Sequence, residues 1–183
     1  RLVGSEMCIR DRYERIGDYA VNIMEKAQEL EEKEASFSET AKNELGILDA
    51  ALENILTLTV DAFENEDVRM ARQVEPLEEI IDILVERLRD QHIKRLKDGA
   101  CSIDTGVVFL DVLNNAERIS DHCSNIAVAM IEVSEDRFDT HEYLNHIKNG
   151  ESPSFEKRYE RYRGRYTFEP GPSGTAAAPE QKK

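Results

Sequence analysis

Apolar residues recur every three or four positions along most of this chain, which is the spacing of one buried face of an α-helix. The series are Ile16 to Leu30, Leu45 to Phe63, Val74 to Leu88 and Val112 to Val133. Long apolar stripes joined by short connections favour helices that pack lengthwise against one another. We therefore predict an all-α fold without β-sheet, an antiparallel bundle of long helices at about 12–35, 38–65, 67–98 and 103–135.

Residues that start or end helices lie between these series. They are Ser36 or Ser38 before the second helix, residues 65–67 before the third, Gly99 after the third, and Ser102 or Asp104 before the fourth. Pro76 falls inside the predicted third helix, where a proline bends the helix or weakens its hydrogen bonding. We expect Pro76 to be either a hinge or a bend in a rigid helix.

Composition limits the classes of function. The chain has 183 residues, 40% of them hydrophobic, and a formal net charge of −14. An acidic surface argues against nucleic-acid binding, which needs basic residues, and suits cation binding. Cys8, Cys101 and Cys123 show no metal-ligand spacing, so we expect reduced thiols in a cytosolic setting. Apolar runs such as Ile126 to Ile131 are too short to insert into a membrane.

Both ends of the chain differ in composition from its middle. Residues 1–11 show no helical periodicity and look like non-native read-through, so we expect them to lie outside the fold. After Asp136 the apolar pattern weakens. We expect short helices near residues 141–148 and 155–166, within an extension at 136–168, and a disordered tail at 169–183.

One ten-residue pattern occurs twice. "ERIGDYAVNI" begins at Glu14 and "ERISDHCSNI" begins at Glu117, and six of the ten aligned positions are identical. Residues four apart share a helix face, so Glu117 and Asp121 form one carboxylate pair, and Glu14 and Asp18 form another. Like charges at this spacing destabilise a helix unless a cation binds them, so the pairs predict metal binding.

The third helix carries a further pair, Glu78 and Asp82. Carboxylates suit iron, manganese, magnesium, calcium or zinc, and helical bundles assemble metal sites from acids on neighbouring helices. The alternative is that these acids are solvated surface residues paired with arginines such as Arg118 and Arg15. We expect His122 and Cys123 to pack in the core or at its boundary.

These segments resemble the PhoU family. "ERIGD", "EEIID" and "ERISD" are similar to its acidic signatures. The segment "HIKRLKDGACSIDTGVVFLDVLNNAERISDHCSNIAVAMIE", with "FDTHEYLNHIK" after it, resembles the carboxy-terminal cytoplasmic region of bacterial sodium/phosphate cotransporters. The resemblance spans about Tyr13 to Tyr166. It implies spectrin-repeat-like three-helix repeats, with residues 12–36 as the last helix of a truncated first repeat and residues 37–135 as the second.

The resemblance also implies a function. It implies control of phosphate uptake or signalling, and iron or zinc clusters on the signature acids, which here are Glu14, Asp18, Glu78, Asp82, Glu117 and Asp121. The implied partner is a membrane-embedded transporter domain or a phosphate-signalling protein. The implied location of this chain is the cytoplasmic face of the membrane. The first-repeat pair lacks the helices that would complete its cluster.

Other functions stay open. One is a metal-free helical adaptor, another a free-standing PhoU-type regulator, and a third a carboxylate-bridged oxidase, which would normally need Glu-x-x-His pairs. The sequence contains no P-loop, no Gly-rich dinucleotide fingerprint and no recognisable nucleophile, so we expect no enzyme activity.

Overall fold

The computed structural model describes residues 2–135 and 153–166. Its elements, in chain order, are α1 (Leu2–Glu32), α2 (Glu39–Glu64), α3 (Val68–Ala71), α4 (Val74–Lys97), α5 (Ile103–Glu135) and α7 (Pro153–Arg165). The all-α prediction is confirmed. The helix expected near residues 141–148 and the tail at 169–183 lie outside the described residues.

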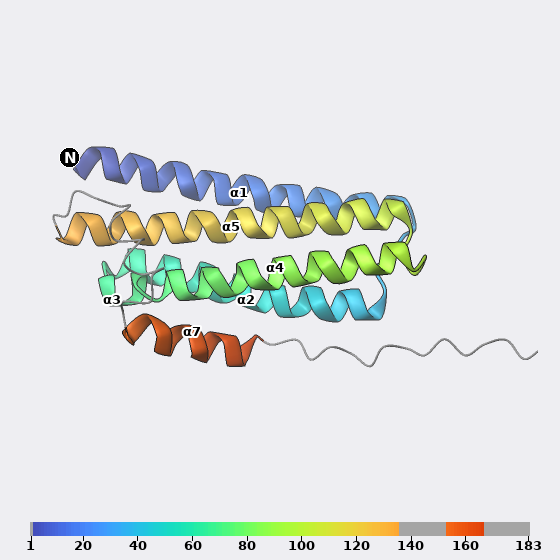
Figure 1. Ribbon diagram of the computed structural model, residues 1–183. Helices are drawn as coiled ribbons and strands as arrows, with labels where there is room; N and C mark the ends of the chain where they lie inside the picture. The colour runs from blue at the N-terminus through green and yellow to red at the C-terminus, as the bar shows by residue number, and fades with distance from the viewer. Residues whose placement is uncertain (1, 136–152, 167–183) are drawn as a thin grey trace, which may run out of the picture.

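The long helices form a lengthwise bundle with α5 at its centre (Figure 1). Helix α5 contacts α1 on one side and α2, α3 and α4 on the other, while α7 packs against α4. Figure 1 shows that α1 and α5 run antiparallel, as do α4 and α5. None of the described helices combines the length and the apolar character that a membrane-crossing segment requires.

The core contains the apolar stripes that the periodicity predicts. Its fully buried side chains include Leu48, Ile55, Leu77, Ile81, Leu84, Leu88, Phe109, Leu113 and Ile126. Helix α7 joins this core through Tyr162, and Tyr166, the residue after the helix, is also buried; the two are 3% and 5% exposed. The Tyr166 hydroxyl accepts a hydrogen bond from Nδ2 of Asn54 on α2 (2.9 Å). The predicted helix at residues 155–166 is therefore present and docked.

The predicted caps define most helix boundaries. The Ser38 side chain accepts from the Ala41 amide (3.2 Å) at the start of α2, and the Ser102 side chain accepts from the Thr105 amide (3.2 Å) at the start of α5. Gly99 follows α4 with a φ of +68°, and the Ala100 amide donates to the Arg95 carbonyl (2.9 Å). This left-handed turn favours glycine because it has no Cβ.

The first helix differs from its prediction. Helix α1 begins at Leu2, about ten residues before the expected start. Ile9 is 6% exposed and belongs to the same core cluster as Ile16, seven residues and two helical turns later. The structure places residues 2–11 in α1 and not outside the fold, because Ile9, one further apolar residue at helical spacing, extends the buried face; their expected origin as read-through stays a prediction.

The third helix is interrupted, and Pro76 does not lie in a helix interior. The chain forms the short helix α3, turns at Arg72 and Gln73, and restarts as α4 at Val74. Pro76 is the third residue of α4, in the first turn, where backbone amides have no intrahelical acceptor. Neither the predicted hinge nor the predicted bend inside a continuous helix is observed.

Replacing Pro76 by alanine should therefore have little effect on stability. We expect the free energy of unfolding to fall by no more than about 1 kcal/mol, because proline at a compatible position acts by restricting the unfolded chain. An interior proline would give the opposite result, a gain of up to about 3 kcal/mol on replacement. Urea denaturation of both proteins distinguishes these outcomes.

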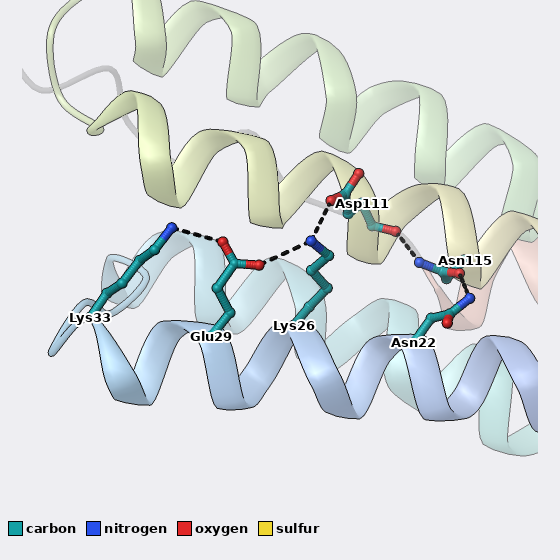
Figure 2. Close-up of polar contacts among 6 residues, drawn as sticks. All are labelled: Asn22, Lys26, Glu29, Lys33, Asp111 and Asn115. Atoms are coloured by element: carbon teal, nitrogen blue, oxygen red, sulfur yellow. Dashed lines mark hydrogen bonds and ion pairs between the residues drawn. The ribbon is translucent and has the colours of Figure 1, made fainter.

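A row of polar contacts joins α1 to α5 (Figure 2). Lys26 of α1 bridges Glu29 (3.0 Å) and Asp111 of α5 (3.1 Å), and Glu29 also pairs with Lys33 (2.8 Å). Further along, Asn22 donates to Oδ1 of Asn115 (3.4 Å). The hydrogen bonds from Lys33 and Lys26 hold the pKa of Glu29 below its usual value. Because these groups lie at the surface, the row contributes little to the free energy of unfolding.

A histidine is buried at the end of the bundle where α4 meets α5. His92 is 1% exposed and stacks on Phe109, with 4.4 Å between ring centroids. Burial lowers the pKa of His92 from its ordinary value of 6.5, and the neighbouring Arg95 lowers it further. The imidazole is therefore neutral at pH 7.

Acid should consequently destabilise the protein through His92. Below about pH 6.5 the unfolded chain binds a proton at this residue that the folded protein does not, so the free energy of unfolding falls with pH. One such proton changes the free energy of unfolding by at most about 1.4 kcal/mol per pH unit. The free energy of unfolding should fall less between about pH 7.5 and 5.5 in His92→Gln than in the wild type, as measured by urea denaturation at each pH. Equal losses would contradict this.

Candidate metal centre

Three of the predicted ligands lie together. Glu78 and Asp82 project from α4, and Asp121 projects from the neighbouring helix α5. One carboxylate oxygen from each lies within 4.8 Å of the others. Residues four apart share a face of α4, and α5 brings Asp121 against that face because the two helices pack antiparallel. We call Glu78, Asp82 and Asp121 the carboxylate cluster.

The dimensions of the carboxylate cluster suit a bound cation. Oxygen ligands of one ion lie about 2.0–2.6 Å from it, so two opposite ligands are about 4–5 Å apart. Glu78 is buried, Asp121 is half-buried and Asp82 is exposed, so the cluster opens from the helix interface to solvent. A carboxylate removed from water is costly unless positive charge compensates it. Oxygen ligands at this spacing suit a hard or intermediate divalent or trivalent cation.

Glu117 lies outside the carboxylate cluster. Its Oε2 pairs with Nη2 of Arg89 on α4 (3.0 Å), and the same nitrogen donates to Oδ1 of Asn114 (3.2 Å). The sequence placed Glu117 and Asp121 in one pair, but the residues of α4 that face them differ. Asp121 faces two acids, whereas Glu117 faces an arginine.

The first-repeat acids are also separate. Glu14 and Asp18 are exposed on α1 and, among the described residues, belong to no group of three potential metal ligands. Ile16, between them, is 9% exposed and packs in the core. The two acids therefore lie on the outward face of α1, away from the packed face that contains Ile16.

Glu75 is a further buried acid of α4, which the sequence did not single out. Glu75 lies one turn before Glu78 and is 6% exposed. The Ser124 hydroxyl of α5 donates a hydrogen bond to its Oε2. Its position three residues before Glu78 was the signal in the sequence, because that spacing puts both acids on adjoining parts of one helix surface.

His122 and Cys123 pack as expected. His122 stacks on Tyr19 of α1, with 5.6 Å between ring centroids, and burial, then Arg12 and Arg15, lowers its pKa. Cys123 is fully buried, and this burial raises its thiol pKa to about 12. A thiol that stays protonated at neutral pH is a poor metal ligand.

A second acidic pair on α4 provides an internal comparison. Glu86 and Asp90 have the same spacing as Glu78 and Asp82, but both are exposed and they belong to no described group of three ligands. The spacing alone therefore does not produce a site. Contact with an acid on α5 distinguishes the carboxylate cluster.

Part of this bundle matches a known protein-family model. Residues 48–130 match the family model described as the PhoU domain, and this range contains all of α3, α4 and the carboxylate cluster. The predicted resemblance to PhoU domains is confirmed over these residues. No solved structure matches the chain.

One similar curated protein is the "Phosphate-specific transport system accessory protein PhoU homolog 1" of Thermotoga maritima. The identity is 27% over 137 residues, covering 75% of this chain. The chain spans only 58% of the length of that relative.

Proposed function

We propose that this chain is a regulatory module that controls phosphate uptake or phosphate signalling, and that a cation on the carboxylate cluster is part of its mechanism. The observation that carries the proposal is the PhoU-domain match over residues 48–130, which contains all three acids of the cluster. The Thermotoga relative, named as an accessory protein of phosphate-specific transport, supports the same role.

The finer context of the proposal is a membrane-embedded partner. That partner would be the transport domain of a sodium/phosphate cotransporter or a phosphate-signalling protein, with the bundle at the cytoplasmic face of the membrane. Regulation requires two states that the ligand distinguishes. An ion held by Glu78, Asp82 and Asp121 ties α4 to α5, so its loss would favour a state in which these helices separate.

The proposed function is tested by phosphate uptake in the source cell. Replacing Glu78, Asp82 and Asp121 by Gln, Asn and Asn in the native gene should abolish the decrease in uptake that follows an increase in external phosphate. The matched control is Glu86→Gln with Asp90→Asn, which alters the same kind of pair on the same helix. Normal control of uptake in the triple variant would exclude the carboxylate cluster from the mechanism and favour the metal-free adaptor.

A further inference from the structure

A cavity lies at the end of the bundle where α2 and α5 both begin. Its volume is about 390 Å³, within the range of small-molecule pockets. Polar residues in its wall are Ser36, Ser38, His92, Arg95, Ser102 and Thr105. It is separate from the carboxylate cluster, with which it shares no residue.

The cavity wall is rich in hydrogen-bond donors. Ser38 uses its side-chain oxygen to accept from a helix amide, which leaves its hydroxyl hydrogen able to donate to a ligand. The Ser102 hydroxyl accepts from the Thr105 amide and is also hydrogen-bonded to Oγ1 of Thr105 (2.8 Å). The N-termini of α2 and α5 add partial positive charge. Among the described residues that line the cavity there is no aspartate or glutamate, although the chain has 38 of them.

Two buried polar groups in the wall have unused hydrogen-bonding capacity. His92 is 1% exposed, and neither of its ring nitrogens makes a hydrogen bond of ordinary geometry with a described residue, although the Gly106 backbone approaches the ring. Nη2 of Arg95 is also buried without a described acceptor. Buried donors of this kind are normally satisfied, so a ligand in this cavity that accepts hydrogen bonds would find donors already in place.

The aromatic residues hold these groups in place. The Phe109 ring stacks on His92, and the Arg95 guanidinium lies 5.4 Å from the centroid of the same ring. Nη1 of Arg95 donates to Oε1 of Glu44 (2.8 Å), so one side of the guanidinium is engaged and fixed. The other side, which carries Nη2, is preorganised for an acceptor.

We propose that this cavity binds a small oxyanion, of the chemistry shared by inorganic phosphate and phosphate monoesters. Nη2 of Arg95 and a ring N–H of His92 would donate to it, together with the hydroxyl of Ser38. The exposed acids Glu39 and Asp104, in the first turns of α2 and α5, are screened by water and salt. This inference goes beyond the proposed function and does not depend on metal binding.

Calorimetric titration of the metal-free protein tests the proposal. Inorganic phosphate and glycerol phosphate are titrated separately, and at least one should bind with a Kd of about 1 mM or tighter. Tighter binding of inorganic phosphate indicates a sensor of the free ion. Tighter binding of glycerol phosphate indicates a ligand with an organic part. Absence of binding by both probes would overturn the proposal.

Variants of residues in the cavity wall test which side chains bind the anion. Arg95→Gln combined with Glu44→Gln removes both partners of a buried pair and should weaken binding at least about tenfold. His92→Phe keeps the stacking on Phe109 but removes both ring nitrogens, and should weaken binding about fivefold. Glu44→Gln alone should strengthen binding severalfold, because it removes the carboxylate that competes for Arg95.

Two control variants test whether binding is specific to this cavity. Arg69→Gln makes the same charge change at an exposed residue of α3, and binding should be unchanged. The triple variant of Glu78, Asp82 and Asp121 should also bind as the wild type does. Binding lost in that triple variant, or unaffected by the Arg95 and His92 variants, would contradict the proposed site.

Discussion

Replacing Ile81 by alanine should lower the free energy of unfolding by about 2–5 kcal/mol. Ile81 is fully buried on α4, the helix that packs against α2, α5 and α7. Removing its side chain takes away apolar contacts and leaves a cavity that a rigid bundle fills only partly. Urea denaturation followed by circular dichroism measures the change.

The matched control is Val60→Ala, a β-branched residue on α2 that is 37% exposed. We expect its free energy of unfolding to change by less than about 1 kcal/mol, because little apolar surface is lost and alanine is the better helix former. Similar destabilisation by the two substitutions would mean that α4 is not in the centre of the packed core.

A cation that binds the carboxylate cluster should stabilise the fold by mass action. At a free concentration of about one hundred times its Kd, the ion should add about 2.7 kcal/mol to the free energy of unfolding. Asp121→Asn should remove most of this gain, because Asp121 is the contribution of α5 to the cluster. The measurement is thermal denaturation in titrations of zinc, ferrous iron, manganese and magnesium.

The control for ion binding is again Glu86→Gln with Asp90→Asn, which should retain the full gain. Equal stabilisation of the wild type and Asp121→Asn would show that the ion acts elsewhere. If none of the four ions stabilises the protein, cation binding does not contribute to the stability of the fold.

Local sequence signals predicted the helices well. Apolar spacing located the long helices, and Ser38, Ser102 and Gly99 marked boundaries within a residue or two, because caps and periodicity depend on near neighbours in the chain. The error at α1 came from residues 2–8, which lack the pattern, so the buried Ile9 was not recognised. The position of Pro76 was predicted wrongly because the break between α3 and α4 is only two residues long, at Arg72 and Gln73. The apolar residues keep their helical spacing across it, so the sequence reads as one continuous helix.

The candidate site was only partly predictable, because ligand sets depend on contacts between helices. The spacing of Glu78 and Asp82 is local, but their proximity to Asp121 depends on how α4 and α5 are aligned. The same alignment puts Arg89 beside Glu117, a contact over 28 residues of sequence. Neither the cavity at the start of α2 and α5 nor the unused donors of His92 and Arg95 has a sequence signature.

The central claim is that Glu78, Asp82 and Asp121 bind a metal ion, and the most direct measurement is elemental analysis of the purified protein. The protein is loaded with each candidate ion, freed of excess by gel filtration and analysed by inductively coupled plasma mass spectrometry. We predict about one ion or more per chain in the wild type and in Glu86→Gln with Asp90→Asn, but none in the triple variant of the carboxylate cluster. A wild-type protein without bound metal, or a triple variant that retains it, would contradict the claim.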